Sequence, residues 1–231
     1  MRVLLKLSWE ALAWWNWWWL DVNMLNQIWN IVEDLKKKKI QVGIVVWAGN
    51  FIRWKEIEQI NIDRCNADNM WMLAININSI ALWDVLSKRW IHVKMMNSFW
   101  IEWIVERFNK AKALKALNDW KVIIFGGWTW NPYFTTDTAW VLRAVEIEAD
   151  LMIKATKVDW VYTKDPVKNH DAEFIEKASY DEVLIKNLKV MDSTAIALAK
   201  DNKLTLKVVN LFNDWAILRA IMWKKEWTTI N

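Results

Sequence analysis

Apolar residues follow two patterns that alternate along this chain of 231 residues. Short β-branched or apolar runs of strand length are each followed by a longer segment in which apolar residues return every three or four positions. The runs predicted as strands are Arg2 to Leu7, Gln41 to Val46, His92 to Met96, Lys121 to Phe125, Leu151 to Lys154 and Leu204 to Asn210. The segments predicted as helices are 22–35, 68–86, 100–117, Thr136 or Asp137 to about Glu148, 192–200, and a last helix opening at Asp214.

Strands that alternate with helices predict βαβ units and a mainly parallel sheet covered by helices on both faces. No internal repeat or low-complexity linker divides the chain, so we expect residues 1–231 to form one domain. In such a sheet, ligands bind outside the carboxyl ends of the strands. Chemistry is therefore expected in the polar loops after Leu7, Val46, Phe125 and Lys154.

Composition limits the classes of function. A net charge of +4 suits a protein that handles anionic metabolites, but it is too mild for a nucleic-acid binder unless it clusters. The single cysteine, Cys65, excludes an internal disulfide and favours a reducing, cytoplasmic setting. Lys6, Glu10 and Asp21 interrupt the apolar amino terminus, which leaves no membrane span of roughly 20 apolar residues. No Cys and His spacing predicts a protein-bound metal.

Two of the four loops offer groups that suit phosphate. Lys6 ends the first predicted strand and can meet a phosphate as a point charge, with Ser8 as a hydroxyl donor. In the loop 47–53, small residues let the backbone approach a ligand, and Arg53 could clamp a phosphate with two hydrogen bonds. Each of these signals is weak alone.

The other two loops are richer in polar groups. The loop 126–138 combines hydroxyls with the start of a helix, whose free N–H groups favour an anion. An equally good interpretation of this loop is a capped helix with Tyr133 and Phe134 in the core. The loop that begins at Lys154 adds a second lysine, a hydroxyl and a ring that could stack on a base.

Six runs decide between these interpretations. They read, in order, KLSWEAL, WAGNFIR, DNMWMLA, WTWNPYFTTDTA, KATKVDWVYTKDP and LKVMDSTAIALA. In order and spacing they resemble the bacterial uridylate (UMP) kinases of the amino-acid-kinase superfamily, over Arg2 to about Thr228. Carbamate, glutamate and aspartate kinases share the fold, but the TTD and KATKVD motifs argue against them.

The resemblance implies a three-layer αβα sandwich around a mainly parallel sheet of about eight strands, assembled as a homohexamer. It implies transfer of the ATP γ-phosphoryl group to UMP in the cytoplasm, with ATP and UMP as the ligands and Mg²⁺ accompanying the ATP. Phosphoryl transfer of this kind needs positioning and cations rather than a covalent nucleophile.

The resemblance also implies roles for individual residues. The residues in catalytic positions are Lys6, Asp137 and Lys154. Those in ATP-binding positions are Lys6, Leu7, Ser8, Trp9, Gly49, Arg53, Thr156, Tyr162 and Asp165. Those in UMP-binding positions are Ala48, Asp68, Thr129, Trp130, Asn131, Pro132, Tyr133, Phe134, Thr135 and Thr136.

The chain departs from the family pattern in one systematic way: it has 4 glycines and 22 tryptophans. Tryptophan stands where the family has glycine at Trp9, Trp47, Trp54, Trp71, Trp128, Trp130, Trp160 and Trp227, and we expect the same of Trp90, Trp120 and several residues of 14–19. Tryptophan neither tolerates positive φ nor lets a backbone touch phosphate. We therefore expect Trp9, Trp128 and Trp130 to crowd the nucleotide cleft.

Two explanations of the tryptophans stay open. They are laid over an unchanged kinase fold by redesign, recoding or misassignment, or the loops have rebuilt around them. Two other functions also stay open: a folded kinase-like scaffold with blocked phosphate loops, and a tryptophan-rich binder of single-stranded nucleic acid or sugar. The second would need its tryptophans along one exposed groove, whereas they are scattered at family glycine positions.

Overall fold

The sheet is the frame of the molecule. A computed structural model describes residues 1–7, 21–51, 59–156, 161–164, 169, 171–213, 215–222 and 227–231. The strands are β1 (Arg2–Leu7), β2 (Gln41–Val46), β3 (Val93–Asn97), β4 (Glu106–Arg107), β5 (Val122–Gly126), β6 (Leu151–Thr156), β7 (Val161–Tyr162), β8 (Phe174–Ile175), β9 (Lys177–Ala178), β10 (Leu206–Asn210) and β11 (Thr228–Ile230). Nine of these form one sheet in the order β4-β3-β5-β2-β1-β6-β10-β11-β9, and β7 pairs with β8 apart from it.

The helices are α1 (Val22–Lys37), α3 (Arg64–Lys88), α4 (Lys110–Asn118), α5 (Thr136–Glu146), α6 (Tyr180–Ile185), α7 (Ser193–Asp201) and α8 (Ala216–Ile221). Apart from the β10–β11 pair, every pair of neighbouring strands in the large sheet is parallel. The prediction of a mainly parallel sheet in an α/β fold is therefore confirmed.

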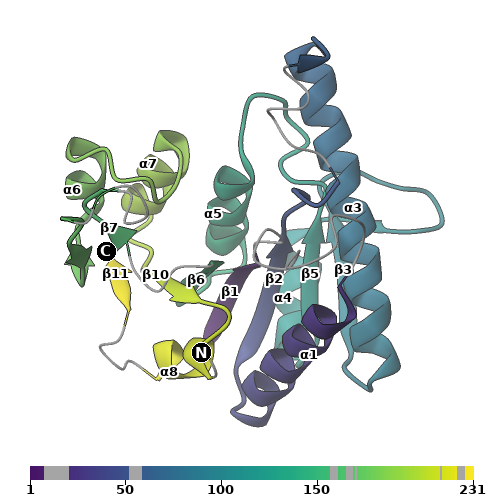
Figure 1. The fold of residues 1–231 in the computed structure, drawn as a ribbon. Helices are drawn as coiled ribbons and strands as arrows, with labels where there is room; N and C mark the ends of the chain where they lie inside the picture. The colour runs from purple at the N-terminus through teal and green to yellow at the C-terminus, as the bar shows by residue number, and fades with distance from the viewer. Residues whose placement is uncertain are drawn as a thin grey trace.

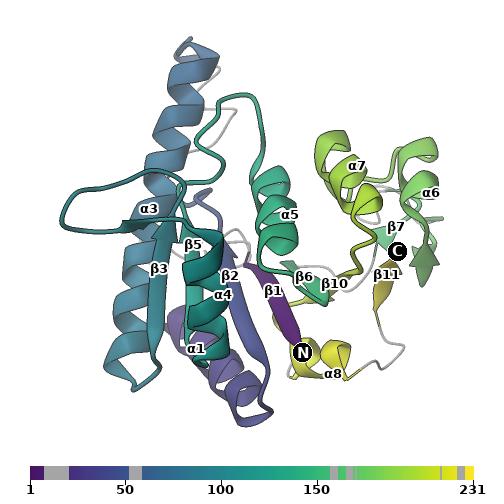
Figure 2. The same ribbon diagram turned by 180° about the vertical axis from the view of Figure 1, so that it is seen from behind.

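The helices form a layer on each face of the sheet, as Figures 1 and 2 show from opposite sides. Residues of α1, α3 and α8 share one hydrophobic cluster with the sheet, and residues of α4, α5, α6 and α7 share the other. Strand alternation produces this division, because Val3 and Leu5 belong to the first cluster and Leu4 to the second. The three-layer arrangement is thus built into the pattern of single strands.

Most predicted elements agree with the structure within a few residues, but the helix expected over 100–117 is half wrong. Ile101 and Val105 form an isolated bridge around a turn, and α4 begins only at Lys110. Trp103 in this turn has φ 67°, a left-handed conformation that a helix cannot contain. Asn109 then caps α4 by accepting a hydrogen bond from the backbone N–H of Lys112 at 3.0 Å.

Tryptophan occupies positive-φ positions to an unusual extent. Six tryptophans have φ between 56° and 67°, namely Trp90, Trp103, Trp120, Trp128, Trp130 and Trp215. Trp90 and Trp120 directly follow the C-caps of α3 and α4, the place where helices most often end in a left-handed glycine. The backbone at these six positions therefore adopts a conformation that favours glycine.

The helix α3 is the one described helix whose length and composition would allow it to cross a membrane, and half of its most apolar window is buried inside the fold. Its residues Met72, Ile75, Leu82 and Leu86 pack in the core. Figure 1 shows its amino-terminal end rising beyond the carboxyl edge of the strands. This end of α3 brings side chains to the edge where ligands of a parallel sheet bind.

Candidate active site

Two lysines meet at the carboxyl edge of the sheet. The parallel strands β1 and β6 pair in a register that sets Lys6 opposite Lys154. Side chains at paired positions point to the same face, so the two ammonium groups are brought close together. Alternation along β1 places Lys6 on the face of Leu4, which is the face that α5 covers.

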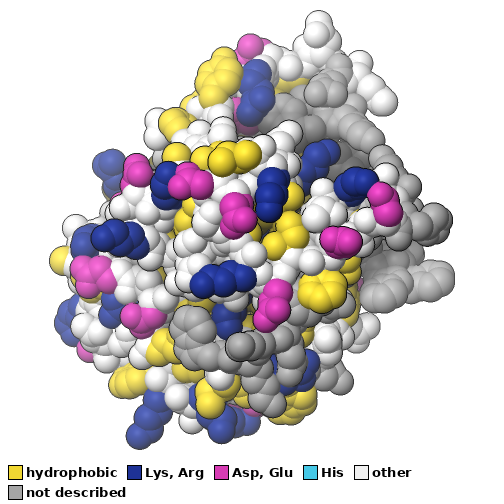
Figure 3. All heavy atoms as spheres, turned by 90° about the vertical axis from the view of Figure 1, so that its left-hand side faces the viewer, with side chains coloured by type: hydrophobic (Ala, Val, Ile, Leu, Met, Phe, Trp, Pro, Cys, Tyr) yellow, Lys and Arg dark blue, Asp and Glu magenta, His cyan; other side chains and the backbone are white. Residues whose placement is uncertain are grey.

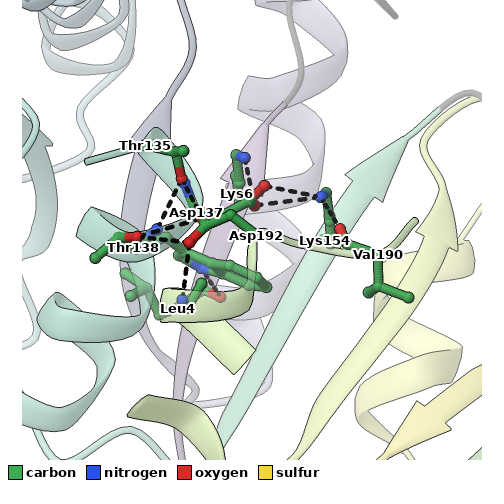
Figure 4. A network of polar contacts seen from close by, with 10 residues as sticks. Leu4, Lys6, Thr135, Asp137, Thr138, Lys154, Val190 and Asp192 are labelled. Carbon is green, nitrogen blue, oxygen red and sulfur yellow. Dashed lines mark hydrogen bonds and ion pairs between the residues drawn. The ribbon is translucent and has the colours of Figure 1, made fainter. Parts of the chain in front are cut away.

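Asp137 lies between the two lysines (Figure 4). It is in the first turn of α5, and its carboxylate accepts a hydrogen bond from Lys6 Nζ at 2.5 Å. Lys154 Nζ lies 3.2 Å from the same carboxylate. We call this set of three residues the Lys–Asp–Lys bridge. The carboxylate screens the repulsion between two cations that the strand register forces together.

Burial sets the protonation of the bridge. Lys6 is 6% exposed, and burial lowers its pKa to about 8 although Asp137 acts to raise it. Burial also opposes the ionisation of Asp137, but the ammonium groups of Lys154 and Lys6 outweigh this and hold the pKa of Asp137 below its usual range. At neutral pH Lys6 and Asp137 therefore form an ion pair.

The cap of α5 is Thr135, one residue before the expected Thr136 or Asp137. Thr135 is extended, with φ −111° and ψ 171°, while Thr136 is already helical. Its hydroxyl oxygen accepts hydrogen bonds from the N–H groups of Asp137 at 3.0 Å and Thr138 at 3.2 Å. The cap thereby fixes the turn that carries Asp137.

Asp68 is fully buried on α3 and faces the loop before α5. Its Oδ2 atom accepts hydrogen bonds from Tyr133 N at 2.7 Å and Arg64 Nε at 2.9 Å. Its Oδ1 atom has no hydrogen-bond partner among the described residues. A buried carboxylate oxygen without a partner is costly, so Oδ1 is an acceptor suited to a ligand hydroxyl.

A cavity of about 130 Å³ lies beside Lys6, Asp137 and the cap of α5, and neither Asp68 nor Lys154 is among its lining residues. Its lining residues are Lys6, Trp47, Arg64, Trp71, Trp128, Phe134, Thr135, Thr136 and Asp137. Small-molecule sites usually measure about 300–1,000 Å³. The rings of Trp47 and Trp71 are 5.5 Å apart, and Trp128 is only 6% exposed, so indole rings fill much of the space beside Lys6 and Asp137.

The expected crowding of the cleft is met at one of its three residues. Trp128 lines the cavity, with φ 56°. Trp130 does not line it but stacks on Phe99, with ring centroids 3.6 Å apart. Trp9 lies outside the described residues.

The remaining predicted UMP-binding residues fall into two groups. Thr135, Thr136 and Phe134 line the cavity. Ala48 is buried and directly follows Trp47, which also lines the cavity. Thr129 and Asn131 are hydrogen-bonded to each other at the surface, where Thr129 Oγ1 accepts from Asn131 N at 3.1 Å, and Pro132 is half-buried beside them. Tyr133 and Phe134 are 69% and 41% exposed, so the alternative that placed both in the core is wrong.

The predicted ATP-binding residues are only partly brought together. Lys6 and Leu7 end β1, and Thr156 ends β6. A Cβ atom at Gly49 would lie 2.2 Å from the ring of Trp47, so a larger residue there would require this indole to move. Tyr162 lies in β7 and does not line the cavity. Ser8, Trp9, Arg53 and Asp165 lie outside the described residues.

Two residues at the site were not predicted. Arg64 lines the cavity and bonds Asp68 one helical turn away, a spacing of four residues that could have signalled the pair. Asp192 accepts hydrogen bonds from the hydroxyls of Thr135 and Thr138. It lies in the LKVMD run that carries the family resemblance, but nothing local indicated its partners.

Comparison with known proteins identifies the family. A family model described as the amino acid kinase family matches residues 16–210. A uridylate kinase of Vibrio campbellii is 41% identical over 230 residues, which cover 100% of this chain and 95% of the relative. A uridylate kinase of Helicobacter hepaticus is 44% identical over 225 residues, with 97% and 95% covered. The chain belongs to the amino acid kinase family, in the uridylate kinase branch.

Solved structures agree with this assignment. The UMP kinase of Bacillus anthracis superposes with a TM-score of 0.94 at 34% identity, covering 100% of this chain and 95% of that one. The UMP kinase of Ureaplasma parvum gives 0.93 at 32% identity, with 100% and 98% covered. Uridylate kinase relatives that match the whole chain support an ATP-dependent nucleoside monophosphate kinase.

Proposed function

We propose that this protein transfers the γ-phosphoryl group of ATP to UMP, giving ADP and UDP. The observation that carries the proposal is the Lys–Asp–Lys bridge, set at the carboxyl edge of the sheet beside the amino terminus of α5. Two fixed ammonium groups at this place suit two phosphate chains that would otherwise repel each other. The uridylate kinase relatives support the choice of acceptor.

The lysines stabilise charge rather than form bonds. As the phosphoryl group moves between two phosphate oxygens, negative charge spreads over its three equatorial oxygens. Lys6 Nζ, held by Asp137, is placed to donate hydrogen bonds to this group, and Lys154 is the second cation. No general base is required, because the attacking phosphate oxygen is already ionised.

The UMP side is formed by α3 and the loop before α5. Asp68 Oδ1 is placed to accept a hydrogen bond from a ribose hydroxyl, since its Oδ2 is already engaged by Tyr133 and Arg64. Thr135 and Thr136 line the cavity at the amino terminus of α5, where backbone N–H groups and the helix dipole favour an anion.

Mg²⁺ is proposed to enter with ATP. Among the described residues, no group of three His, Cys, Asp or Glu side chains could hold a metal ion. Mg²⁺ keeps several waters and is bound mainly through substrate phosphates, so its proposed ligands are the phosphates of ATP. When bound, the ion neutralises charge on the β- and γ-phosphates, while the chain's own lysines hold the transferring group.

The proposed setting is the cytoplasm, with ATP and UMP as partners and no nucleic acid. On the face over α6 and α7, Lys and Arg side chains are interspersed with Asp and Glu, and no basic stripe runs across it (Figure 3). A mixed surface of this kind lacks the clustered charge by which proteins hold a phosphate backbone.

We also propose that the protein assembles as a homo-oligomer, a homohexamer by family resemblance. The observation that supports self-association is an apolar stripe on α3, formed by Met70, Leu73 and Ile77, which are 40–51% exposed. These residues are three and four positions apart, so they form one face of the helix. We call this set the α3 stripe.

The proposed reaction is tested by UMP-dependent release of ADP from Mg·ATP, with CMP as the comparison acceptor. Turnover with UMP and little with CMP is expected. Soluble, folded protein with turnover on neither acceptor would contradict the activity and support a kinase fold whose cleft is closed by indole rings.

The variant Asp68→Asn tests the UMP side. It keeps an acceptor for Tyr133 N but replaces the acceptor proposed for ribose with an NH2 donor, so the KM for UMP is expected to rise about tenfold or more while that for ATP changes little. Asp84→Asn, an exposed carboxylate paired with Lys88 on the same helix, is the matched control. Equal effects on both nucleotides would contradict the assignment.

A further inference from the structure

Asp192 makes more contacts than a helix cap requires. It is the N-cap of α7, and its Oδ1 atom accepts a hydrogen bond from Ala195 N at 3.0 Å. The same carboxylate accepts hydrogen bonds from the hydroxyl of Thr138, 3.2 Å away, and from that of Thr135. Both threonines belong to the amino terminus of α5, so one carboxylate joins the starts of two helices.

The Thr135 hydroxyl links Asp192 to the backbone of Asp137. The Thr135 hydroxyl donates to Asp192 and accepts from the N–H groups of Asp137 and Thr138. A hydroxyl has a single proton, so donation to Asp192 leaves its oxygen lone pairs directed at the first turn of α5. Asp192 thus fixes the rotation of the group that caps the turn carrying Asp137.

The segment just before Asp192 contacts Lys154, the second lysine of the Lys–Asp–Lys bridge. Lys154 Nζ donates a hydrogen bond to the carbonyl oxygen of Val190, in addition to its contact with Asp137. Residues 190–192 therefore touch both the second lysine and the helix turn of the Lys–Asp–Lys bridge. Figure 4 shows these contacts converging from β1, β6, α5 and the start of α7.

The charges of the cluster also balance. Lys6 and Lys154 contribute two positive charges, and Asp137 and Asp192 contribute two negative ones. The charged side chains that face Lys6 among the described residues are Asp137 of α5, Lys154 of β6 and Asp192 before α7, with Arg64 of α3 lining the same cavity. No hydrogen bond joins Asp192 to Lys6 among the contacts of the described residues. Asp192 therefore affects Lys6 through its charge and through the position of α5.

We propose that Asp192 is a positioning residue of the phosphoryl-transfer site, which holds the first turn of α5 so that Asp137 stays between the two lysines. The proposal rests on the proposed function for its kinetic consequence. It differs from a purely structural cap, because Asn and Ser cap helices about as well as Asp does.

The variant Asp192→Asn separates the two roles. Its side-chain oxygen can still accept from Ala195 N and from the Thr138 hydroxyl, but its amide presents a donor where the Thr135 hydroxyl needs an acceptor. We expect kcat to fall about tenfold or more, because small misplacement of catalytic groups is costly, while the melting temperature changes by a few degrees at most. Asp192→Ser, which caps α7 but is too short to reach Thr135, should show the same loss.

A second readout does not depend on turnover. Asp192 raises the pKa of Lys6, so its neutralisation should lower that pKa further below about 8. Titration of the lysine side chains by nuclear magnetic resonance, in protein without nucleotide, measures this directly. In the kinetics, the basic limb of kcat/KM should move to lower pH in the variant, because Lys6 then loses its proton sooner.

The control is Asp181→Asn, an aspartate in the first turn of α6 that pairs with Lys200 at 2.5 Å on the surface. It should leave both kcat and the Lys6 titration unchanged. The proposal is overturned if Asp192→Asn retains kcat within twofold of the parent and Lys6 titrates as before. A parent without UMP turnover would instead contradict the proposed function, while the Lys6 titration would still decide the role of Asp192.

Discussion

At the scale of residues, the pKa of Lys6 is determined by its burial and by the charged side chains next to it. Lys6 is a strand lysine whose charge is penalised by burial and supported by Asp137 at 2.5 Å. The result is a pKa of about 8, which is close to neutral pH, whereas a surface lysine would stay charged well above it. The reactivity of the site is therefore expected to depend on pH through this one side chain.

The first prediction concerns this pH dependence. The value of kcat/KM should fall as the pH rises through about 8, because Lys6 must be protonated to hold the transferring group. Lys6→Arg should retain part of the activity and lose this basic limb, since a guanidinium stays charged. Initial rates across the range with UMP limiting measure both. A basic limb that persists in Lys6→Arg would assign it to another group.

The same shift predicts a change in stability. The pKa of Lys6 is lower in the folded protein than its ordinary 10.5, so the unfolded chain binds more protons between about pH 8 and 10.5. The contribution of Lys6 to the free energy of unfolding therefore increases with pH in this window. Denaturant titrations of the parent and of Lys6→Met, compared at both ends of the window, measure this contribution.

The second prediction concerns backbone strain at a single residue. Trp90 is 93% exposed and has φ 66°. Its left-handed backbone is therefore strained, and its side chain gains little packing energy that could offset the strain. Trp90→Gly should raise the free energy of unfolding by about 1 kcal/mol. Trp83→Gly is the matched control: Trp83 is also exposed but lies inside α3, where glycine should lower stability by about 1 kcal/mol. Equal signs for the two variants would contradict the role of φ.

At the scale of elements, the loop between β5 and α5 decides access to the site. It begins at Gly126 and Gly127, passes Trp128 and Trp130 in left-handed conformations, and ends at the cap of α5. Positive φ at Trp128 and Trp130 is a conformation that favours glycine. The side chain of Trp128 nevertheless lines the cavity, together with Lys6 and Asp137.

The third prediction follows from this loop. Trp128→Gly should relieve the strained φ and enlarge the cavity from about 130 Å³ toward the size of a nucleotide site. Calorimetry should show UMP binding at least about tenfold tighter than in the parent, a gain of about 1.4 kcal/mol. The matched control is Trp130→Gly, which relieves a similar φ of 58° but removes a ring that does not line the cavity. Unchanged UMP affinity in Trp128→Gly would show that the indole does not block the cleft.

At the scale of the whole molecule, α3 serves two surfaces. One side of the helix packs in the core and carries Asp68 to the site, and the other presents the α3 stripe to solvent. Contiguous apolar side chains on an exposed helix face mark an association surface. A second copy of this chain is the occupant that the homo-oligomer proposal names.

The fourth prediction tests that surface. The double variant Leu73→Glu, Ile77→Glu should reduce the molar mass measured by light scattering, because charges on the α3 stripe would be buried against each other. Ile185→Glu is the control: Ile185 is 83% exposed on α6, at the other end of the molecule from α3 in Figures 1 and 2. A parent that is already monomeric, or a double variant of unchanged mass, would contradict the proposal.

Local patterns determined much of this protein. The strands and the long helices follow from hydrophobic periodicity, because each element buries one face, and most predicted bounds hold within a few residues. Motif order along the chain indicated the family and singled out Lys6, Asp68 and Asp137. Periodicity failed at 100–109, where a left-handed Trp103 breaks a pattern that otherwise suits a helix.

Only the tertiary structure decided what those residues do together. Lys6 and Asp137 are 131 positions apart, and their contact depends on the register of β1 with β6 and on where α5 begins. The contact of Asp192 with Thr135, and the place of Trp128 in the lining of the cavity, depend in the same way on packing between distant segments. Hydrophobic periodicity indicates which face of a single element is buried. Strand register and helix packing determine which side chains from distant segments come into contact, and the proposed chemistry depends on those contacts.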